Sequence, residues 1–397
     1  MRVYSALEEE NIRDGNLVRE WTVSGLLDSM QGNILRTELQ TDLRQTNVFL
    51  RGVLWIFTTL IVITGVGLLA TMDLLMSHTQ GAILFIVSGV VCWVLAEFAC
   101  RNRLYRYGVE ESLAVCAAVL FAIGVSEIFR RNGEWATIVG LAVGSIGGLA
   151  IYRRFGFIYA AVGSLAACAA IPFQLDIGIA GKRIAAALVF AAALALVRFQ
   201  RQESEEPAGS GLPAIEATAW LGTYLMLNIQ LGATLFAVPA WLFYSPYRSS
   251  NPEIATGFYI FSWAMTWLLP AAGLWLGLAK KDRLLIDVSV AMTLLTLSTN
   301  KRYLGWEVHA WDPMMLGVVL MTAAIAIRRW LQKGPNDERD GFTALRLLRS
   351  DERKLAAVSI ASSVMQPHAS TVKQTDAPHD FREGGGSSGG GGASGKF

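Results

Sequence analysis

Apolar residues dominate the chain from Gly52 to Trp330, where long apolar runs alternate with short polar breaks. A helix needs about 20 apolar residues to cross the roughly 30 Å hydrocarbon core of a bilayer. Strands of a membrane barrel would alternate apolar and polar residues, and these runs do not. We therefore predict an all-α polytopic transmembrane helix bundle of about ten spans. The predicted spans are residues 52–72, 82–99, 109–129, 136–152, 156–173, 183–198, 216–244, 255–279, 284–299 and 313–330.

Four regions follow from this pattern. We expect a cytoplasmic helical N-terminal region at residues 1–50 and a transmembrane domain at 51–330, with a polar linker near 199–215. An amphipathic helix is expected at 331–366, because apolar residues recur there at helical spacing. The Gly/Ser-rich end, residues 367–397, has the composition of a disordered tail.

The N-terminal region carries its own helix signals. Ser5 and Glu8 match a capping box, which predicts a helix beginning beside Ser5. Gly15 is expected to end this helix, and Gly32 with Asn33 to divide the following apolar pattern into two short helices. These helices either pack together as a small cap or lie on the membrane surface.

Composition and charge support a membrane protein. The chain is 53% hydrophobic and 17% charged, with a mean hydropathy of +0.41, whereas about a quarter of the residues are charged in a soluble domain. A net charge of +2 gives no reason to expect a nucleic-acid partner. Arginine and lysine gather at alternate ends of the predicted spans, which by the positive-inside rule places both termini in the cytoplasm. The expected location is the cytoplasmic membrane, which the chain crosses several times.

No motif for catalysis or cofactor binding is present in the sequence. It contains no phosphate-binding loop and no HExxH, and GxSxG or Rossmann glycine spacing occurs only in the Gly/Ser-rich tail and within an apolar run at residues 65–70, where it indicates no such site. Its four cysteines form no CxxC pair, and its four histidines are scattered. We therefore predict no metal and no cofactor, and the sequence favours a protein that is not an enzyme.

Polar residues inside the predicted spans are few. Glu97 and Glu127 lie near span ends, where we expect ion pairs with Arg101 and with Arg130 or Arg131. The candidate intramembrane polar residues are Asn228, Gln230 and Asp287. The two amides either hydrogen-bond to a neighbouring helix or line a substrate path. For Asp287, a pair with Arg283 competes with a functional buried carboxylate.

Three glycines, Gly140, Gly144 and Gly148, recur at every fourth residue and form two overlapping GxxxG patterns. Glycine removes the side-chain bulk that keeps helices apart, so this spacing predicts close helix packing. The sequence leaves open whether the partner is another helix of this chain or a second copy in a homo-oligomer.

The richest chemistry lies in the loop before the last predicted span, in the segment NKRYLGWEVHAWD. Its candidate binding residues are Lys301, Arg302, Trp306, Glu307, His309 and Trp311, together with Arg248 from the loop near residues 245–253. One interpretation is an anion- or headgroup-binding site with Lys301 and Arg302 as its cations. The other is an interfacial aromatic belt in which Asp312 caps the last helix.

The segment LVREWTVSGLLDSMQGNILRTEL ahead of the spans resembles the short helical N-terminal domain of bacterial polytopic membrane proteins that have no assigned activity. The end GGGSSGGGGASG resembles the glycine-serine tails of some bacterial envelope proteins. These resemblances imply a location in the cell envelope and carry over no activity.

The leading functional hypothesis is a non-enzymatic envelope protein, embedded in the lipid bilayer, that acts by binding a lipid or a protein partner, the latter at its cytoplasmic ends. The first alternative is a transporter or channel for a small anionic or amphipathic solute, running along residues 216–244 toward the Lys301 loop. The second is a membrane enzyme acting on a lipid-linked substrate at the outer face, with Glu307 and His309 as acid and base.

Overall fold

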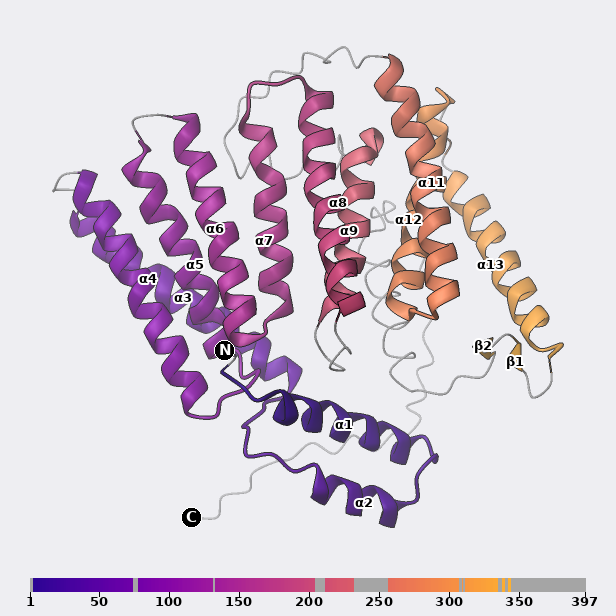
Figure 1. Ribbon diagram of the computed structural model, residues 1–397, viewed down its shortest axis with the longest axis horizontal. Helices are drawn as coiled ribbons and strands as arrows, with labels where there is room; N and C mark the ends of the chain where they lie inside the picture. The colour runs from indigo at the N-terminus through magenta and orange to yellow at the C-terminus, as the bar shows by residue number, and fades with distance from the viewer. Residues whose placement is uncertain are drawn as a thin grey trace, which may run out of the picture. The chain divides into compact units, whose positions relative to one another are not determined.

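The computed structural model describes residues 3–73, 78–130, 133–203, 211–231, 256–306, 309, 311–334, 338–339 and 342–343. Within these residues the protein is an all-α bundle, and the predicted fold class is confirmed (Figure 1). The helices are α1 (Ala6–Val23), α2 (Ser29–Glu38), α3 (Val48–Asp73), α4 (His78–Arg101), α5 (Val109–Ile128), α6 (Glu134–Phe155), α7 (Ile158–Ala170) with the 3₁₀ turn η2 (Ile171–Gln174), α8 (Ile179–Glu203), α9 (Leu212–Leu227), α11 (Thr256–Lys280), α12 (Arg283–Tyr303) and α13 (Asp312–Leu331).

Seven of the described helices, α3, α4, α5, α6, α8, α11 and α13, are long and apolar enough to cross a membrane. The three other predicted spans overlap α7, α9 and α12. α7 with η2 is shorter, and α9 ends at Leu227, well before the predicted end of its span. Residues 232–244 of that span lie outside the described part of the chain. A membrane protein is therefore supported, and the count of ten spans stays a prediction.

The helices pack mainly against their neighbours in sequence. α3, α4, α5, α6 and α7 form one group, and α8, α9, α11 and α12 form a second, with α7 contacting α8 and α9 (Figure 1). The core of the first group includes Ile151 and Phe155, and that of the second includes Tyr224 and Met292. α13 contacts α12 and otherwise presents exposed apolar side chains, as a lipid-facing helix would.

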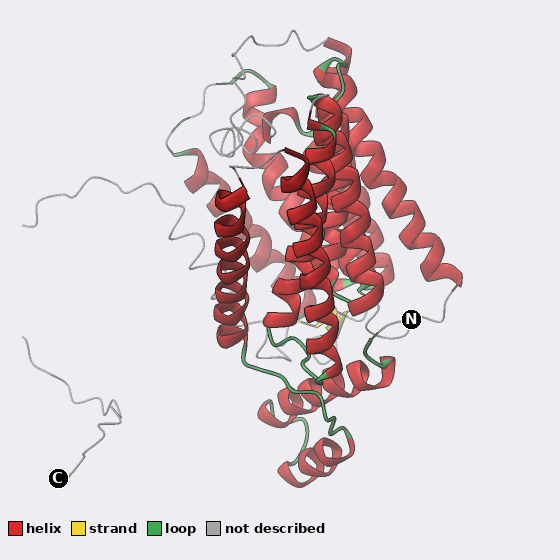
Figure 2. Cartoon of the chain, turned by 90° about the vertical axis from the view of Figure 1, so that its left-hand side faces the viewer, coloured by secondary structure: helices red, strands yellow, loops and turns green. Residues whose placement is uncertain are grey.

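The N-terminal helices α1 and α2 lie across one end of the bundle (Figure 2). The segment before α1 contacts the end of α6 on one side and the end of α4 with the loop after it on the other. The Val3 amide donates to the Arg154 carbonyl at 2.9 Å, and the Tyr4 hydroxyl donates to the Leu104 carbonyl at 2.5 Å and contacts the Cys100 thiol at 3.0 Å. Burial raises the pKa of Tyr4 above its usual value, so this hydroxyl is a neutral donor.

The capping box at Ser5 is partly as predicted, since Ser5 Oγ accepts from the Glu8 amide at 3.1 Å. The predicted breaks were wrong. α1 continues through Gly15 to Val23, and α2 contains Gly32. The turn lies instead at Gly25, whose φ of 76° is in the left-handed region that glycine enters without steric cost. A glycine inside a helix costs only about 1 kcal/mol, which the rest of α1 outweighs.

After α13, Glu338–Arg339 (β1) pairs antiparallel with Phe342–Thr343 (β2). The amphipathic helix predicted for 331–366 falls mostly outside the described residues. So does the Gly/Ser-rich tail.

Candidate functional site

Helix α9 stops at Asn228, inside what the sequence predicts to be one long span. Asn228 has φ −78° and ψ 99°, an extended conformation, and residues 229–231 then return to helical backbone. A break at this depth frees backbone groups that lipid cannot satisfy, so side chains must do so. Breaks of this kind in membrane helices are tolerated where they are buried in protein or line a cavity.

The side chain of Asn228 supplies most of the missing hydrogen bonds. Its Oδ1 accepts from the backbone amides of Gln230 at 3.1 Å and Leu231 at 3.2 Å, capping the turn that follows. The Ile229 amide donates to the Tyr303 hydroxyl at 2.8 Å. Ser262 Oγ donates to the Leu227 carbonyl at 2.5 Å. Each of these backbone groups therefore has a polar partner.

The remaining hydrogen bonds of Asn228 reach Tyr224 in α9 and two residues of α12. Its Nδ2 donates to the Tyr224 hydroxyl at 3.0 Å and to Thr299 Oγ1 at 3.3 Å, and Tyr303 donates to its Oδ1 at 3.2 Å. Tyr224 in turn lies 2.9 Å from Thr296 Oγ1. Asn228 and Tyr224 are fully buried. These residues, together with Ser262 of α11, are called the Asn228 cluster below.

Arg183 brings a positive charge to this cluster from α8. Its Nη1 donates to the carbonyls of Met226 at 3.3 Å and Asn228 at 3.2 Å. These are the last carbonyls of α9, where the helix dipole is negative. Arg183 is 8% exposed, and no carboxylate among the described residues lies within ion-pair distance of it. A buried cation without a counter-charge is costly in a membrane, so Arg183 is the most unusual group of the site.

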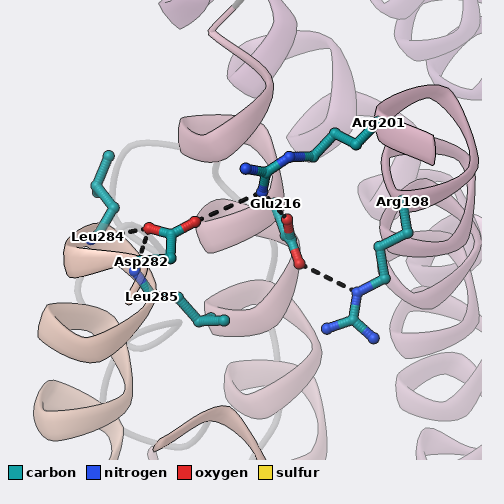
Figure 3. A network of polar contacts seen from close by, with 6 residues as sticks. All are labelled: Arg198, Arg201, Glu216, Asp282, Leu284 and Leu285. Carbon is teal, nitrogen blue, oxygen red and sulfur yellow. Dashed lines mark hydrogen bonds and ion pairs between the residues drawn. The ribbon is translucent and has the colours of Figure 1, made fainter. Parts of the chain in front are cut away.

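The opposite ends of the same helices carry a second polar network (Figure 3). Glu216 of α9 accepts from Arg198 Nε at 3.1 Å and from Arg201 Nη1 at 2.6 Å, both on α8. Arg201 also reaches Asp282 at 3.5 Å. Asp282 caps α12 by accepting from the amides of Leu284 and Leu285 (Figure 3). The ends of α8, α9 and α12 are thus joined through charged groups.

The predicted binding loop is held by its own contacts. Lys301 Nζ lies 2.5 Å from Asp312 Oδ1 and 5.3 Å from the centre of the Trp311 ring. The His309 amide donates to Asp312 at 2.9 Å, and its ring lies 5.6 Å from that of Trp311. These bonds, that of Lys301 foremost, hold the pKa of the Asp312 carboxyl below its usual value. The charge of Lys301 is therefore already matched by a carboxylate.

The other residues of this predicted site are spread out. Arg302 and Trp306 are exposed. Glu307 and Arg248 lie outside the described residues. The loop thus brings together Lys301, His309 and Trp311 around Asp312, an arrangement that an aromatic belt with a capped helix also requires.

Of the predicted intramembrane polar residues, Asn228 is at the centre of its cluster. Gln230 is half-buried in the turn that Asn228 caps, and Asp287 is exposed on α12. The predicted pairs near the span ends are confirmed for Glu97 and Arg101 at 3.9 Å and for Glu127 and Arg130 at 3.2 Å.

The glycines of α6 differ in how tightly they are packed. A Cβ added to Gly148 would lie 2.8 Å from the Ala160 carbonyl of α7, whereas one added to Gly140 or Gly144 would meet side chains of α5 at 3.1 or 3.5 Å. All three therefore face helices of the same chain, Gly148 most closely.

Sequence reasoning missed the central role of Arg183 and the buried acids Glu110 and Glu111 at the start of α5. Glu111 binds Arg51 of α3, with Nε and Oε2 2.8 Å apart. The signal for the Asn228 cluster was present in α12, where hydroxyl residues recur at helical spacing along one face, at Thr296, Thr299 and Tyr303.

Three comparisons with known proteins found no similar protein. No protein-family model matches the chain, and neither the curated proteins nor the solved structures compared with it gave a match.

Proposed function

We propose that this protein is a non-enzymatic integral membrane protein that binds a small anion at the break in α9 and carries it across the membrane. The observation behind the proposal is the buried guanidinium of Arg183, whose partners are two carbonyls of a broken helix. An anion would supply the counter-charge that no carboxylate of the described residues provides at this position.

Three further features support binding at this place. The Asn228 cluster contains several hydroxyl groups that can donate to an anion as well as accept. The break interrupts a helix of the bundle, as in transporters whose substrates bind at discontinuous helices. The second network, around Glu216, holds α8, α9 and α12 together at the other end, and such a contact can keep one side of a transport path closed.

We place both termini in the cytoplasm. The positive-inside rule supports this orientation. Arg103, in the loop after α4, pairs with Glu8 of α1, and Arg154, at the end of α6, accepts from Val3, which puts these basic residues and α1 at the same end of the bundle. Periplasmic exposure of a tag at either terminus would refute it.

The experiment measures heat stability of the detergent-purified protein with chloride, inorganic phosphate, sulfate, acetate and succinate. A ligand that prefers the folded state adds about 2.7 kcal/mol of stability at 100 times its Kd. We expect at least one anion to stabilise the wild type and Arg130→Gln, a control in which an exposed arginine is lost, but not Arg183→Gln. Arg183→Lys, which keeps the charge, should respond in part.

An unchanged anion response in well-folded Arg183→Gln would refute this site. If an anion binds, uptake into liposomes tests the second half of the proposal. Binding without uptake would leave a binding protein and remove the transport role.

A second candidate function is the binding of a protein partner by the N-terminal helices. Its support is a set of exposed apolar side chains on α1, on α2 and in the turn between them, including Trp21, Leu26, Met30 and Ile34. A partner with an amphipathic helix could cover these residues. If photo-crosslinkers placed at Met30 and Ile34 in cells capture no more protein than one at the charged position Arg13, this candidate is wrong.

A further inference from the structure

Two hydrogen-bond donors beside Glu216 have no acceptor. The network in Figure 3 uses Arg198 Nε, but the Nη2 atom of the same guanidinium is buried and unpaired within the described residues. The indole Nε1 of Trp220 is also buried and unpaired there. Buried donors are almost always satisfied in folded proteins, so two such atoms in one place point to a group that is yet to bind.

The two donors belong to side chains that touch. The guanidinium carbon of Arg198 lies 5.4 Å from the centre of the Trp220 ring, a cation–π contact. Trp220 is 6% exposed and so is held firmly by the bundle. The Arg198 side chain is 31% exposed, which leaves one side of the pair reachable from the surface.

The chemistry of the missing group follows from these donors. One is cationic and one neutral, neither can accept, and Glu216 already occupies Nε. The complement is an anionic group with at least two acceptor oxygens. Phosphate has this character, and arginine is the side chain best suited to bind it.

The depth of the pair also suits phosphate. Arg198 lies about one turn before the end of the membrane-length part of α8, which ends at Arg201. Phospholipid phosphates lie at this boundary, where tryptophan and arginine are enriched. Lys280 and Arg283, at the hairpin between α11 and α12, add positive charge at the same end of the bundle.

We propose that Arg198 Nη2 and Trp220 Nε1 bind the oxygens of a phosphate group, carried by a phospholipid or free in solution. The site lies at the opposite end of α8 and α9 from the Asn228 cluster. It shares no residue with that cluster or with Arg183, so binding here does not require an anion at the break in α9.

The test uses Trp220→Phe, because phenylalanine keeps a ring beneath Arg198 and removes only the donor. The matched control is Trp275→Phe, which deletes an exposed indole on α11. Heat stability of the purified proteins is titrated with dioleoylphosphatidylglycerol, with dioleoylglycerol, which lacks the phosphate, and with inorganic phosphate.

We expect a phosphate-bearing probe to stabilise the wild type and Trp275→Phe, with about tenfold weaker apparent affinity for Trp220→Phe, as the loss of one hydrogen bond to a charged group predicts. Dioleoylglycerol should have no effect. A response to phosphatidylglycerol alone identifies a lipid as the source, and a response to inorganic phosphate identifies the free ion. Equal responses of Trp220→Phe and wild type, equal effects of the two lipids, or no response of the wild type to either phosphate probe would overturn the proposal.

Discussion

Glu216→Gln keeps the size of the side chain that joins α8 and α9 and removes its charge. Glu216 is 3% exposed and accepts two charge-assisted hydrogen bonds, at 3.1 Å from Arg198 and 2.6 Å from Arg201. Glutamine has one acceptor oxygen, so one of these bonds is weakened and an amide nitrogen is turned toward the other guanidinium.

The magnitude is set by two limits. Hydrogen bonds to charged groups contribute roughly 1.5–3 kcal/mol each, and breaking a fully buried ion pair costs about 3–5 kcal/mol. The arginines are 31% and 23% exposed, so they can turn partly toward water and the upper limit does not apply. We expect the free energy of unfolding to fall by about 2–4 kcal/mol. For a protein of this size that corresponds to a decrease in apparent Tm of roughly 2–5 °C.

The assay is the fraction of protein that stays monodisperse after heating in one detergent at pH 7. Glu127→Gln is the control, because its pair with Arg130 is exposed and such pairs contribute about 0–1 kcal/mol. In the double variant Glu216→Gln/Arg201→Gln, the free energy of unfolding should fall by less than the sum of the two single decreases, since each substitution removes the same contact. Equal effects of Glu216→Gln and Glu127→Gln, or strict additivity, would refute the reasoning.

Two further predictions concern packing and pH. Gly148→Ala should lower the free energy of unfolding by about 1–3 kcal/mol, because the new methyl group meets a backbone carbonyl that cannot move freely. Gly144→Ala should leave the free energy of unfolding nearly unchanged. Equal heat stability of the two variants would contradict the packing described for α6. The Asp312 pKa is depressed by Lys301, so the stability that this bond gives is present above the ordinary value of 3.8 and lost as the pH falls through the lower folded value. Asp312→Asn should therefore differ from wild type in heat stability by a constant amount between about pH 5 and 8, and a difference that changes across this window would show that another group is titrating.

The fold was predictable because lipid leaves few choices. An apolar run of bilayer length must form a helix, and each predicted range overlaps a described helix even where the edges differ. α12 is longer than predicted because Asp282 caps it at one end, and it continues through the polar residues Thr299 and Lys301 at the other. Polar residues at a span end do not by themselves stop a helix.

The candidate site was less predictable, because its partners are far apart in sequence. Asn228 stands out as an amide in an apolar run, but its role depends on Tyr303, 75 residues away, and on Arg183, 45 residues before it. Arg183 itself resembles an ordinary basic residue at a span end until the carbonyls that it binds are known. The loop at Lys301 shows the reverse case. Its charged and aromatic residues suggest a binding site in the sequence, but in the structure Lys301, His309 and Trp311 contact one another or Asp312.

The inserted N-terminal segment constrains how the chain is made. Residues leave the ribosome in order, yet Val3 hydrogen-bonds to the carbonyl of Arg154, which lies at the end of α6, after α3, α4 and α5. Tyr4 likewise can form its hydrogen bonds only after Cys100 and Leu104 have been made. This segment is made before the helices that it binds, and it can reach its place only after α6 has been made. Until then it must stay on the side of the membrane where α4 and α6 end, so this segment can dock only once α3, α4, α5 and α6 have been made.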